Sequence, residues 1–257
     1  MSRLENYLEL ARRIAAEAGR LTLEHFRGDF EVESKADGSP VTVADRRAEE
    51  LIRERLAREC PDHGVLGEEL GDDSRGASHR WIIDPIDGTL AFARGVPLYA
   101  TLVALEIDSR VVVGVAEFPA LGETVWAARG SGCFWNGRPC RASAVGALED
   151  AVVAYTEPRS FADLGKDEAW KRVCEATRYR TGWRDAYGHA LVATGRIEAM
   201  LDPIMNPWDC GPFAVILPEA GGYFGDWSGR ETIYASEAVS AAPGIVSQLL
   251  ELTSDRP

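Results

Sequence analysis

The spacing of apolar residues along the first sixty positions predicts two helices. From residue 3 to 27, leucine, isoleucine, alanine and aromatic side chains recur every three or four positions, which is typical of a long amphipathic helix, and Gly28 ends it. The charged segment from Thr42 to about Cys60 begins with a capping-box pattern, Thr42 and Asp45, and is expected to form the second helix. Between the two helices, Lys35–Pro40 has the Gly-Ser-Pro composition of a turn or flexible loop.

Short apolar runs after residue 60 predict the strands of a sheet. Gly64–Glu69 is a small strand ending in paired glutamates, and the uninterrupted run Trp81–Ile83 predicts a buried strand. A hairpin signal follows around Asn136. Three closely spaced strands lie before it, at Thr101–Ile107, Val111–Phe118 and Glu123–Ala128. Residues 1–141 are therefore predicted to form an α+β half with helices and an antiparallel sheet.

Helices and strands alternate from about residue 142 onwards. The predicted strands are Val152–Tyr155 and Glu198–Leu201, and the predicted helices cover residues 166–177, 185–195, 208–220 and 245–252. This alternation predicts an α/β second half, residues 142–257, with a mostly open sheet. No internal repeat and no long linker separates the halves, so we expect them to pack closely against each other.

The stretch that follows the buried strand, Asp84-Pro85-Ile86-Asp87-Gly88-Thr89, carries the candidate chemistry. Pro85 stiffens the bend between the two carboxylates, and Gly88 lets a ligand approach the main chain closely. Thr89 offers a hydroxyl where a helix can start. Rigidly held carboxylates beside free amide donors suit a divalent cation that bridges a phosphate. The alternative is an ordinary surface turn, but such a turn needs no fully apolar strand leading into it.

Three further acidic positions each allow an ordinary structural explanation. Glu68 and its neighbour Glu69 could be a solvated pair, and Asp45 could simply cap its helix. Asp209 could be there because a negative charge interacts favourably with the dipole at the start of its helix. Against this, the strands that precede Glu68 and Asp84 both end in carboxylates. Two such strands in succession indicate a shared site at one edge of the sheet.

Charge and cysteine content restrict the class of partner. A net charge of −13 argues against nucleic acid or an anionic membrane as an extended partner, whereas a small phosphorylated ligand remains compatible because bound cations reverse the local potential. The five cysteines form no Cys-x-x-Cys pair and the four histidines lack metal-ligand spacing, so neither a disulfide framework nor a zinc site is expected. Without an apolar run of membrane-spanning length or a signal peptide, we expect a cytoplasmic protein with reduced thiols.

Taken together, these motifs resemble the inositol monophosphatase family over nearly the whole chain. The resemblance is carried by Gly67-Glu68-Glu69, Asp84–Thr89, Trp208-Asp209 and Glu219–Gly222. It implies an α+β to α/β fold in which helices and sheets alternate as an αβαβα layered sandwich. It also implies a homodimer that hydrolyses phosphate monoesters with Mg²⁺, by in-line attack of a metal-activated water. Arg94–Pro97 and Leu201–Asn206 are similar to the histidinol-phosphatase branch of this family.

The resemblance further implies roles for single residues. Two to three Mg²⁺ ions per site would be held by Glu68, Asp84, the carbonyl of Ile86, Asp87 and Asp209. Oxygen-only ligands agree independently with Mg²⁺ rather than zinc. Glu68, Thr89 and Asp45 would act in catalysis. The substrate would contact Ile86, Asp87, Gly88, Thr89, Arg184, Asp185, Asp202 and Asp209.

Substrate choice is expected to depend on the second half. Inositol-type relatives usually carry small residues where Arg184 and Asp185 stand, and a carboxylate there could bind the ammonium or imidazole of histidinol phosphate. The alternatives are a surface ion pair at these two positions, an inositol-1-phosphatase or broader monophosphatase, and a catalytically silent binding protein on the same fold. Two departures from the family pattern, Ala91 and Ser240–Gly244, affect no predicted metal ligand.

Overall fold

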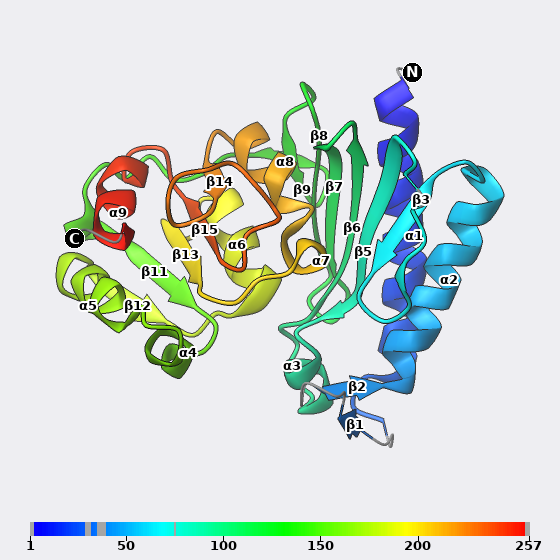
Figure 1. The fold of residues 1–257 in the computed structure, drawn as a ribbon, viewed down its shortest axis with the longest axis horizontal. Helices are drawn as coiled ribbons and strands as arrows, with labels where there is room; N and C mark the ends of the chain where they lie inside the picture. Colours follow the sequence, from blue (N-terminus) through cyan, green and yellow to red (C-terminus); the bar gives the residue numbers. More distant parts are fainter. Residues whose placement is uncertain (1–2, 29–31, 35–39, 75, 255–257) are drawn as a thin grey trace.

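The computed structural model describes residues 3–28, 32–34, 40–74 and 76–254, which form five alternating layers of helices and sheets. Figure 1 shows the layers side by side: α1 (Arg3–His25) and α2 (Val43–Glu59), an eight-stranded sheet, α6 (Asp185–Ala193), α7 (Pro207–Cys210) and α8 (Phe213–Glu219), a five-stranded sheet, and finally α4 (Pro158–Asp163), α5 (Asp167–Ala176) and α9 (Val246–Thr253). The predicted αβαβα sandwich is confirmed. Except for Pro40, the predicted loop Lys35–Pro40 lies outside the described residues.

The larger sheet has the strand order β10-β9-β8-β7-β6-β5-β3-β4. All neighbours run antiparallel except β3 and β5, which pair in parallel. Its strands are β3 (Gly64–Gly67), β4 (Gly71–Asp72), β5 (His79–Asp87), β6 (Ala100–Ile107), β7 (Arg110–Phe118), β8 (Glu123–Ala128), β9 (Cys133–Trp135) and β10 (Arg138–Cys140). A separate hairpin joins β1 (Val32–Ser34) to β2 (Pro40–Thr42).

The middle of strand β5, Trp81–Ile83, is apolar without interruption because helices cover both faces of the strand there. Trp81 and Ile83 pack with α1 and α2, whereas Ile82, between them, packs with α6 and α8. All three side chains are fully buried. A strand buried on both faces has no polar side to alternate with, and this explains the apolar run in the sequence. The ladder between β5 and β6 becomes irregular from Asp84 to Asp87, at the end of the strand.

The smaller sheet has the strand order β12-β11-β13-β15-β14. Its members are β11 (Val152–Tyr155), β12 (Tyr179–Thr181), β13 (Ala199–Asp202), β14 (Tyr223–Gly225) and β15 (Ala238–Ala241), with a 3₁₀ turn at Leu148–Asp150 just before β11. Strand β11 pairs in parallel with β12 and β13, and β15 runs antiparallel to β13 and β14. One apolar core fills the space between the two sheets and draws side chains from both halves of the chain, so the halves do not stand apart.

The predicted helix 208–220 is wrong in one respect, because it is two short helices. Helix α7 ends at Cys210 and α8 begins at Phe213. Pro212 has no amide hydrogen to continue the helical ladder, and its ring clashes with the carbonyl four residues earlier. The break lets the start of α7 point at the end of β5 while α8 lies along the sheet. Glu68 also differs from prediction, since it follows β3 in a turn rather than ending the strand. None of the described helices has the length and apolar character to cross a membrane.

Candidate active site

Three carboxylates from two distant parts of the chain meet where β5 ends. Asp84 and Asp87 lie on the irregular last part of β5, where the Thr101 hydroxyl donates to the Pro85 carbonyl across 2.9 Å and holds the bend. Asp209 comes from the first turn of α7. One oxygen from each of Asp84, Asp87 and Asp209 lies within 4.8 Å of the others. The structure therefore gathers three of the predicted metal ligands at one point.

Each of these carboxylates uses one oxygen to fix its orientation. Asp84 Oδ1 accepts from the Ile86 amide at 2.9 Å, and Asp87 Oδ2 accepts from the Ala186 amide at 2.8 Å. Asp209 Oδ2 accepts from the Asn206 amide at 2.8 Å, as a helix-capping residue does. The capping explanation of Asp209 is thus correct and compatible with a site, because its other oxygen is left for a ligand.

The electrostatics of the cluster favour a cation. Burial, and then repulsion from Glu68 and other carboxylates, raises the pKa of Asp84 well above its usual value, and burial with repulsion from Asp185 does the same to Asp87. Burial, reinforced by Glu68, raises the pKa of Asp209 to about 7. Such a group of buried carboxylates is strained when ionised, and a divalent ion relieves the strain. The donors are all oxygens, which fits Mg²⁺.

Thr89 and Asp45 are brought together as predicted. Asp45 is fully buried, and its Oδ2 accepts from the amide and hydroxyl of Thr42 at 2.8 and 2.6 Å, which completes the capping box of α2. Its Oδ1 lies 3.4 Å from the Thr89 hydroxyl. That hydroxyl is also 3.1 Å from the carbonyl of Ile86, and its one hydrogen can serve only one acceptor at a time. Asp45 is therefore both a cap and a neighbour of the site.

Gly88 is required by the backbone beside the cluster. Its φ is +80°, and a Cβ at this position would lie 2.9 Å from the Leu98 carbonyl and 3.1 Å from Asp185 Oδ2. It precedes the short helix α3 (Thr89–Ala93), so the chain turns sharply after Asp87. The turn after Asp87 can lie this close to Leu98 of the first half and Asp185 of the second half only because residue 88 has no side chain.

A cavity of about 370 Å³ opens over the cluster. From the first half it is lined by Glu68, Asp87, Gly88 and Thr89, and from the second half by Arg184, Asp185, Asp202 and Asp209, among others. These include every predicted substrate-binding residue except Ile86. Ile86, Asp84 and Asp45 are buried and do not line the cavity. The predicted site residues thus form two groups, one that lines the cavity and one that is buried beneath it.

Arg184 and Asp185 form an ion pair, but this pair is a wall of the cavity. Arg184 Nε lies 2.7 Å from Asp185 Oδ2, and the Asp185 side chain is only 14% exposed. The Asp185 backbone has φ +54°, an unusual value for a non-glycine residue, and its amide donates to the Thr156 hydroxyl at 3.0 Å. Burial raises the pKa of Asp185, and Arg184 opposes the rise. The alternative of a surface ion pair does not describe this arrangement.

Two buried side chains that the sequence analysis did not select lie next to the cavity. His189 is fully buried, with Nε2 3.6 Å from Asp202 Oδ2 and Nδ1 2.7 Å from the hydroxyl of Ser240. Ser240, one of the departures from the family pattern, thus has a structural role beneath the site. The role of Ser240 is visible only in its contact with His189, 51 positions away, so no local signal in the sequence could have revealed it.

Glu49 was also missed, and it holds the turn that carries Glu68. Its fully buried carboxylate accepts from the amides of Glu69 and Leu70 at 2.8 and 3.1 Å and from Arg53 Nε at 2.8 Å. A Cβ on Gly67 would lie 2.2 Å from Glu49 Oε1, so the glycine makes room for the carboxylate. Glu49 comes four residues after Asp45 on α2 and therefore shares its helix face, which is the signal that could have found it.

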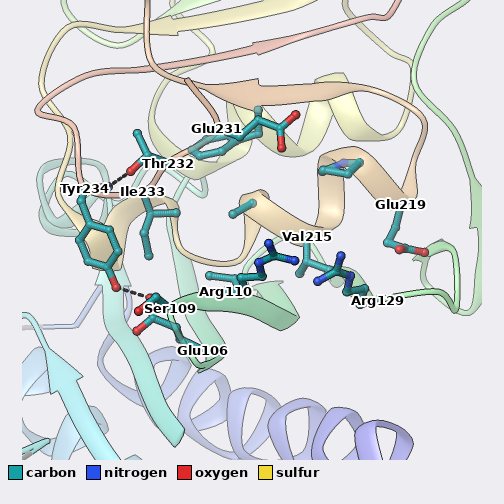
Figure 2. A pocket seen from close by; sticks show the side chains of 14 residues that line it. Glu106, Ser109, Arg110, Arg129, Val215, Glu219, Glu231, Thr232, Ile233 and Tyr234 are labelled. Carbon is teal, nitrogen blue, oxygen red and sulfur yellow. Dashed lines mark hydrogen bonds between the residues drawn. The ribbon is translucent and has the colours of Figure 1, made fainter. Parts of the chain in front are cut away.

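Another cavity, larger at about 510 Å³, lies elsewhere in the molecule. Figure 2 shows Arg110 and Arg129 among the residues that line it, with Tyr234 and Glu219 at opposite sides. It lies near the beginning of β5, where Arg80 and Tyr234 both bond to Glu106, whereas the carboxylate cluster is at the end of that strand. None of the predicted site residues lines it. The candidate chemistry therefore belongs to the smaller cavity.

Comparison with known proteins finds relatives along nearly the whole chain. The sequence model of the inositol monophosphatase family matches residues 3–255. A histidinol-phosphatase of Chlorobaculum parvum is 45% identical over 91% of each chain, and one of Streptomyces coelicolor is 35% identical over 97% of each. Among solved structures, the extragenic suppressor protein suhB of Bartonella henselae superposes with a TM-score of 0.90 at 29% identity, covering 98% of this chain and 100% of that one.

Proposed function

The chain belongs to the inositol monophosphatase family, and from that premise we propose that it is a Mg²⁺-dependent phosphatase whose substrate is histidinol phosphate. Its family and its histidinol-phosphatase relatives make it a phosphoric monoester hydrolase. The observation that carries the substrate proposal is the acidic second-half wall of the cavity, where Asp185 and Asp202 stand. A cationic leaving group such as histidinol can pair with these carboxylates, whereas inositol has no charge to offer.

We assign the metal to the cluster at the end of β5. Asp84, Asp87 and Asp209 supply the central ligands, and Glu68 and the Ile86 carbonyl complete the set for two to three ions. Bound Mg²⁺ supplies positive charge that offsets the phosphate dianion and makes a nearby water more acidic. The hydrogen bonds from Ile86, Ala186 and Asn206 hold the three carboxylates in place before any ion arrives.

The remaining residues of the chain position the reactants. With its hydrogen directed to Asp45, the Thr89 hydroxyl presents its lone pairs to an attacking water, and Glu68 accepts a hydrogen from that water. Gly88, without a Cβ, lets the main chain turn sharply beside the cluster and approach Leu98 and Asp185 closely. Arg184 holds one oxygen of Asp185, so the other is free to face the leaving group. We propose that the attack is in line, with the water and the leaving group on opposite sides of the phosphate.

A phosphate-release panel tests the proposal. With Mg²⁺ present, kcat/KM should be highest for histidinol phosphate, compared with inositol 1-phosphate and an adenosine bisphosphate. A preference for inositol 1-phosphate would replace the substrate while leaving the reaction class unchanged. Failure to release phosphate from any monoester would favour the alternative of a silent binding protein on this fold.

We also propose a cytoplasmic homodimer, as the resemblance implies. Light scattering coupled to gel filtration measures the mass in solution against the 28.0 kDa of one chain. A mass of one chain at working concentrations would contradict the dimer.

The metal-free protein is expected to lose stability as the pH rises from 3.8 through about 7. The folded-state pKa values of Asp84, Asp87 and Asp209 lie above the ordinary 3.8, and that of Asp209 is about 7. In this window the folded chain binds more protons than the unfolded chain, so each rise in pH lowers the free energy of unfolding. Mg²⁺ replaces these protons and should raise Tm most at the upper end of the window. Melting curves with and without Mg²⁺ measure this, and a Mg²⁺ effect independent of pH would contradict it.

Changing Glu49 to Gln should weaken Mg²⁺ binding without altering the ligands themselves. The amide group can keep only one of the two acceptor oxygens that hold the Glu69 and Leu70 amides, so the Glu68 turn loosens. Partners of metal ligands typically contribute about 10–100-fold to metal affinity or activity. We expect the Mg²⁺ concentration for half-maximal rate to rise about tenfold. Glu50→Gln, the exposed neighbour on the same helix, is the matched control and should behave as wild type; equal effects of the two changes would contradict the assignment.

A further inference from the structure

Two cysteines face each other across the hairpin at the edge of the larger sheet. The turn at Asn136 and Gly137, with φ values of 48° and 79°, sets a register in which Cys133 of β9 pairs directly with Cys140 of β10. Both thiols are free, and their Sγ atoms lie 3.3 Å apart in a hydrogen bond. Residues paired in an antiparallel ladder have Cα atoms about 4.5–5.5 Å apart, within the range of about 4.4–6.8 Å that a disulfide spans.

The two thiols differ in exposure and acidity. Cys133 is buried, at 2% exposed, whereas Cys140 is half-buried and can be reached from solvent. The hydrogen bond with Cys133 lowers the pKa of the Cys140 thiol, Arg196 acts in the same direction, and burial opposes them. Arg196 is held at the hairpin by its stacking on Trp135 at 4.4 Å. Cys140 is therefore the sulfur that ionises, and Cys133 stands behind it as a partner.

We propose that this pair is an oxidation site at which a hydroperoxide forms an intramolecular disulfide between Cys133 and Cys140. The Cys140 thiolate attacks a peroxide oxygen, the O–O bond breaks, and the hydroxide that leaves takes up a proton, which makes Cys140 a sulfenic acid and releases water. The Cys133 sulfur then attacks the Cys140 sulfur. The S–O bond breaks and the second hydroxide leaves as water with the Cys133 proton. Two thiols thus lose two electrons, and one hydrogen peroxide becomes two waters.

The arrangement favours a disulfide over further oxidation. A sulfenic acid on Cys140 would form within contact distance of the Cys133 sulfur, so closure competes with a second peroxide molecule. Across the described ranges, no sulfur–sulfur contact is made by Cys60, Cys174 or Cys210. The pair is also remote from the carboxylate cluster within the larger sheet. Strands β8, β7 and β6 lie between the hairpin and β5, which carries Asp84 and Asp87. The proposal therefore does not depend on the phosphatase assignment.

Peptide mapping of the full-length protein tests it directly. The reduced protein is treated with stoichiometric hydrogen peroxide, unfolded, alkylated and digested with trypsin. Cleavage follows Arg129 and Arg141 but not Arg138, which precedes a proline, so one peptide, residues 130–141, carries both cysteines. We expect this peptide to lose two hydrogens and escape alkylation, and dithiothreitol to reverse the change. Cys174, also half-buried, is the internal control and should stay alkylated.

Two variants separate the roles of the sulfurs. In Cys133→Ser, Cys140 should stop at a sulfenic acid that dimedone traps, whereas in Cys140→Ser, Cys133 should remain a free thiol. Circular dichroism checks that both variants fold. The peptide mapping of the wild-type protein tests the proposal even if neither variant folds. Alkylation of Cys133 and Cys140 to the same extent as Cys174 would overturn the proposal. So would sulfinic acid on Cys140 without a disulfide, or a disulfide to another cysteine.

Discussion

Asp87→Asn is expected to abolish phosphatase activity while leaving the fold intact. Asn can keep the hydrogen bond from the Ala186 amide at 2.8 Å, so the loop retains its anchor, but the charge that binds the cations is lost. Metal ions in such sites contribute several kcal/mol of transition-state stabilisation, and a loss of about 4 kcal/mol corresponds to about a thousandfold in kcat. Phosphate release at saturating Mg²⁺ measures the loss, and circular dichroism checks the fold.

Stability in the absence of metal supplies a second readout for the same variant. Burial and neighbouring carboxylates raise the pKa of Asp87 well above its usual value, which means that its charge opposes folding at neutral pH. Without metal, Asp87→Asn should therefore be more stable than wild type, and it should gain less Tm from Mg²⁺. Asp108→Asn, at an exposed turn with φ +49° that asparagine tolerates, is the control and should change neither property. Substantial residual activity of Asp87→Asn would refute the metal-site assignment.

Local chemistry made the centre of this site predictable from the sequence. The apolar run at Trp81–Ile83 followed by Asp84–Thr89 contains a buried strand, a stiff bend and a glycine within nine positions, so few arrangements are possible. The layered fold and the inclusion of Asp209 came from resemblance to a family, because nothing near Asp209 distinguishes a ligand from a helix cap. The structure shows that it is a cap and also lies beside the other two carboxylates.

Several of the features that escaped prediction depend on contacts between distant segments. Strands β14 and β15, of three and four residues, are too short to show the alternation of apolar and polar residues that predicts a strand. They form because each pairs with a neighbouring strand. Glu49 shares the helix face of Asp45, which is a local signal, but the turn that its carboxylate holds comes from another segment of the chain. The break between α7 and α8 was foreseeable, since Pro212 carries a local signal that the apolar pattern of residues 208–220 obscured.

Asp185→Asn should distinguish the proposed substrate from its main rival. Asparagine suits the positive φ of 54°, where alanine would be strained, so the change removes the charge and keeps the shape. If histidinol is the leaving group, Asp185 pairs with its cation inside a partly desolvated cavity. A hydrogen bond to a charged group contributes about 1.5–3 kcal/mol, so kcat/KM for histidinol phosphate should fall about ten- to a hundredfold.

The rival substrate provides the control for this variant. Inositol 1-phosphate carries no cation, so its kcat/KM should change little when Asp185 becomes Asn. Asp185 is not among the proposed metal ligands, and the half-saturating Mg²⁺ concentration should stay close to wild type. Arg184 is the ion-pair partner of Asp185. In Asp185→Asn it loses the carboxylate that it contacts at 2.7 Å, and its side chain could swing into the cavity. The double variant Arg184→Gln, Asp185→Asn removes that possibility and should retain the selective loss for histidinol phosphate. If kcat/KM falls equally for both substrates in both variants, Asp185 supports the cavity wall without contacting the leaving group. The histidinol assignment then loses its physical basis.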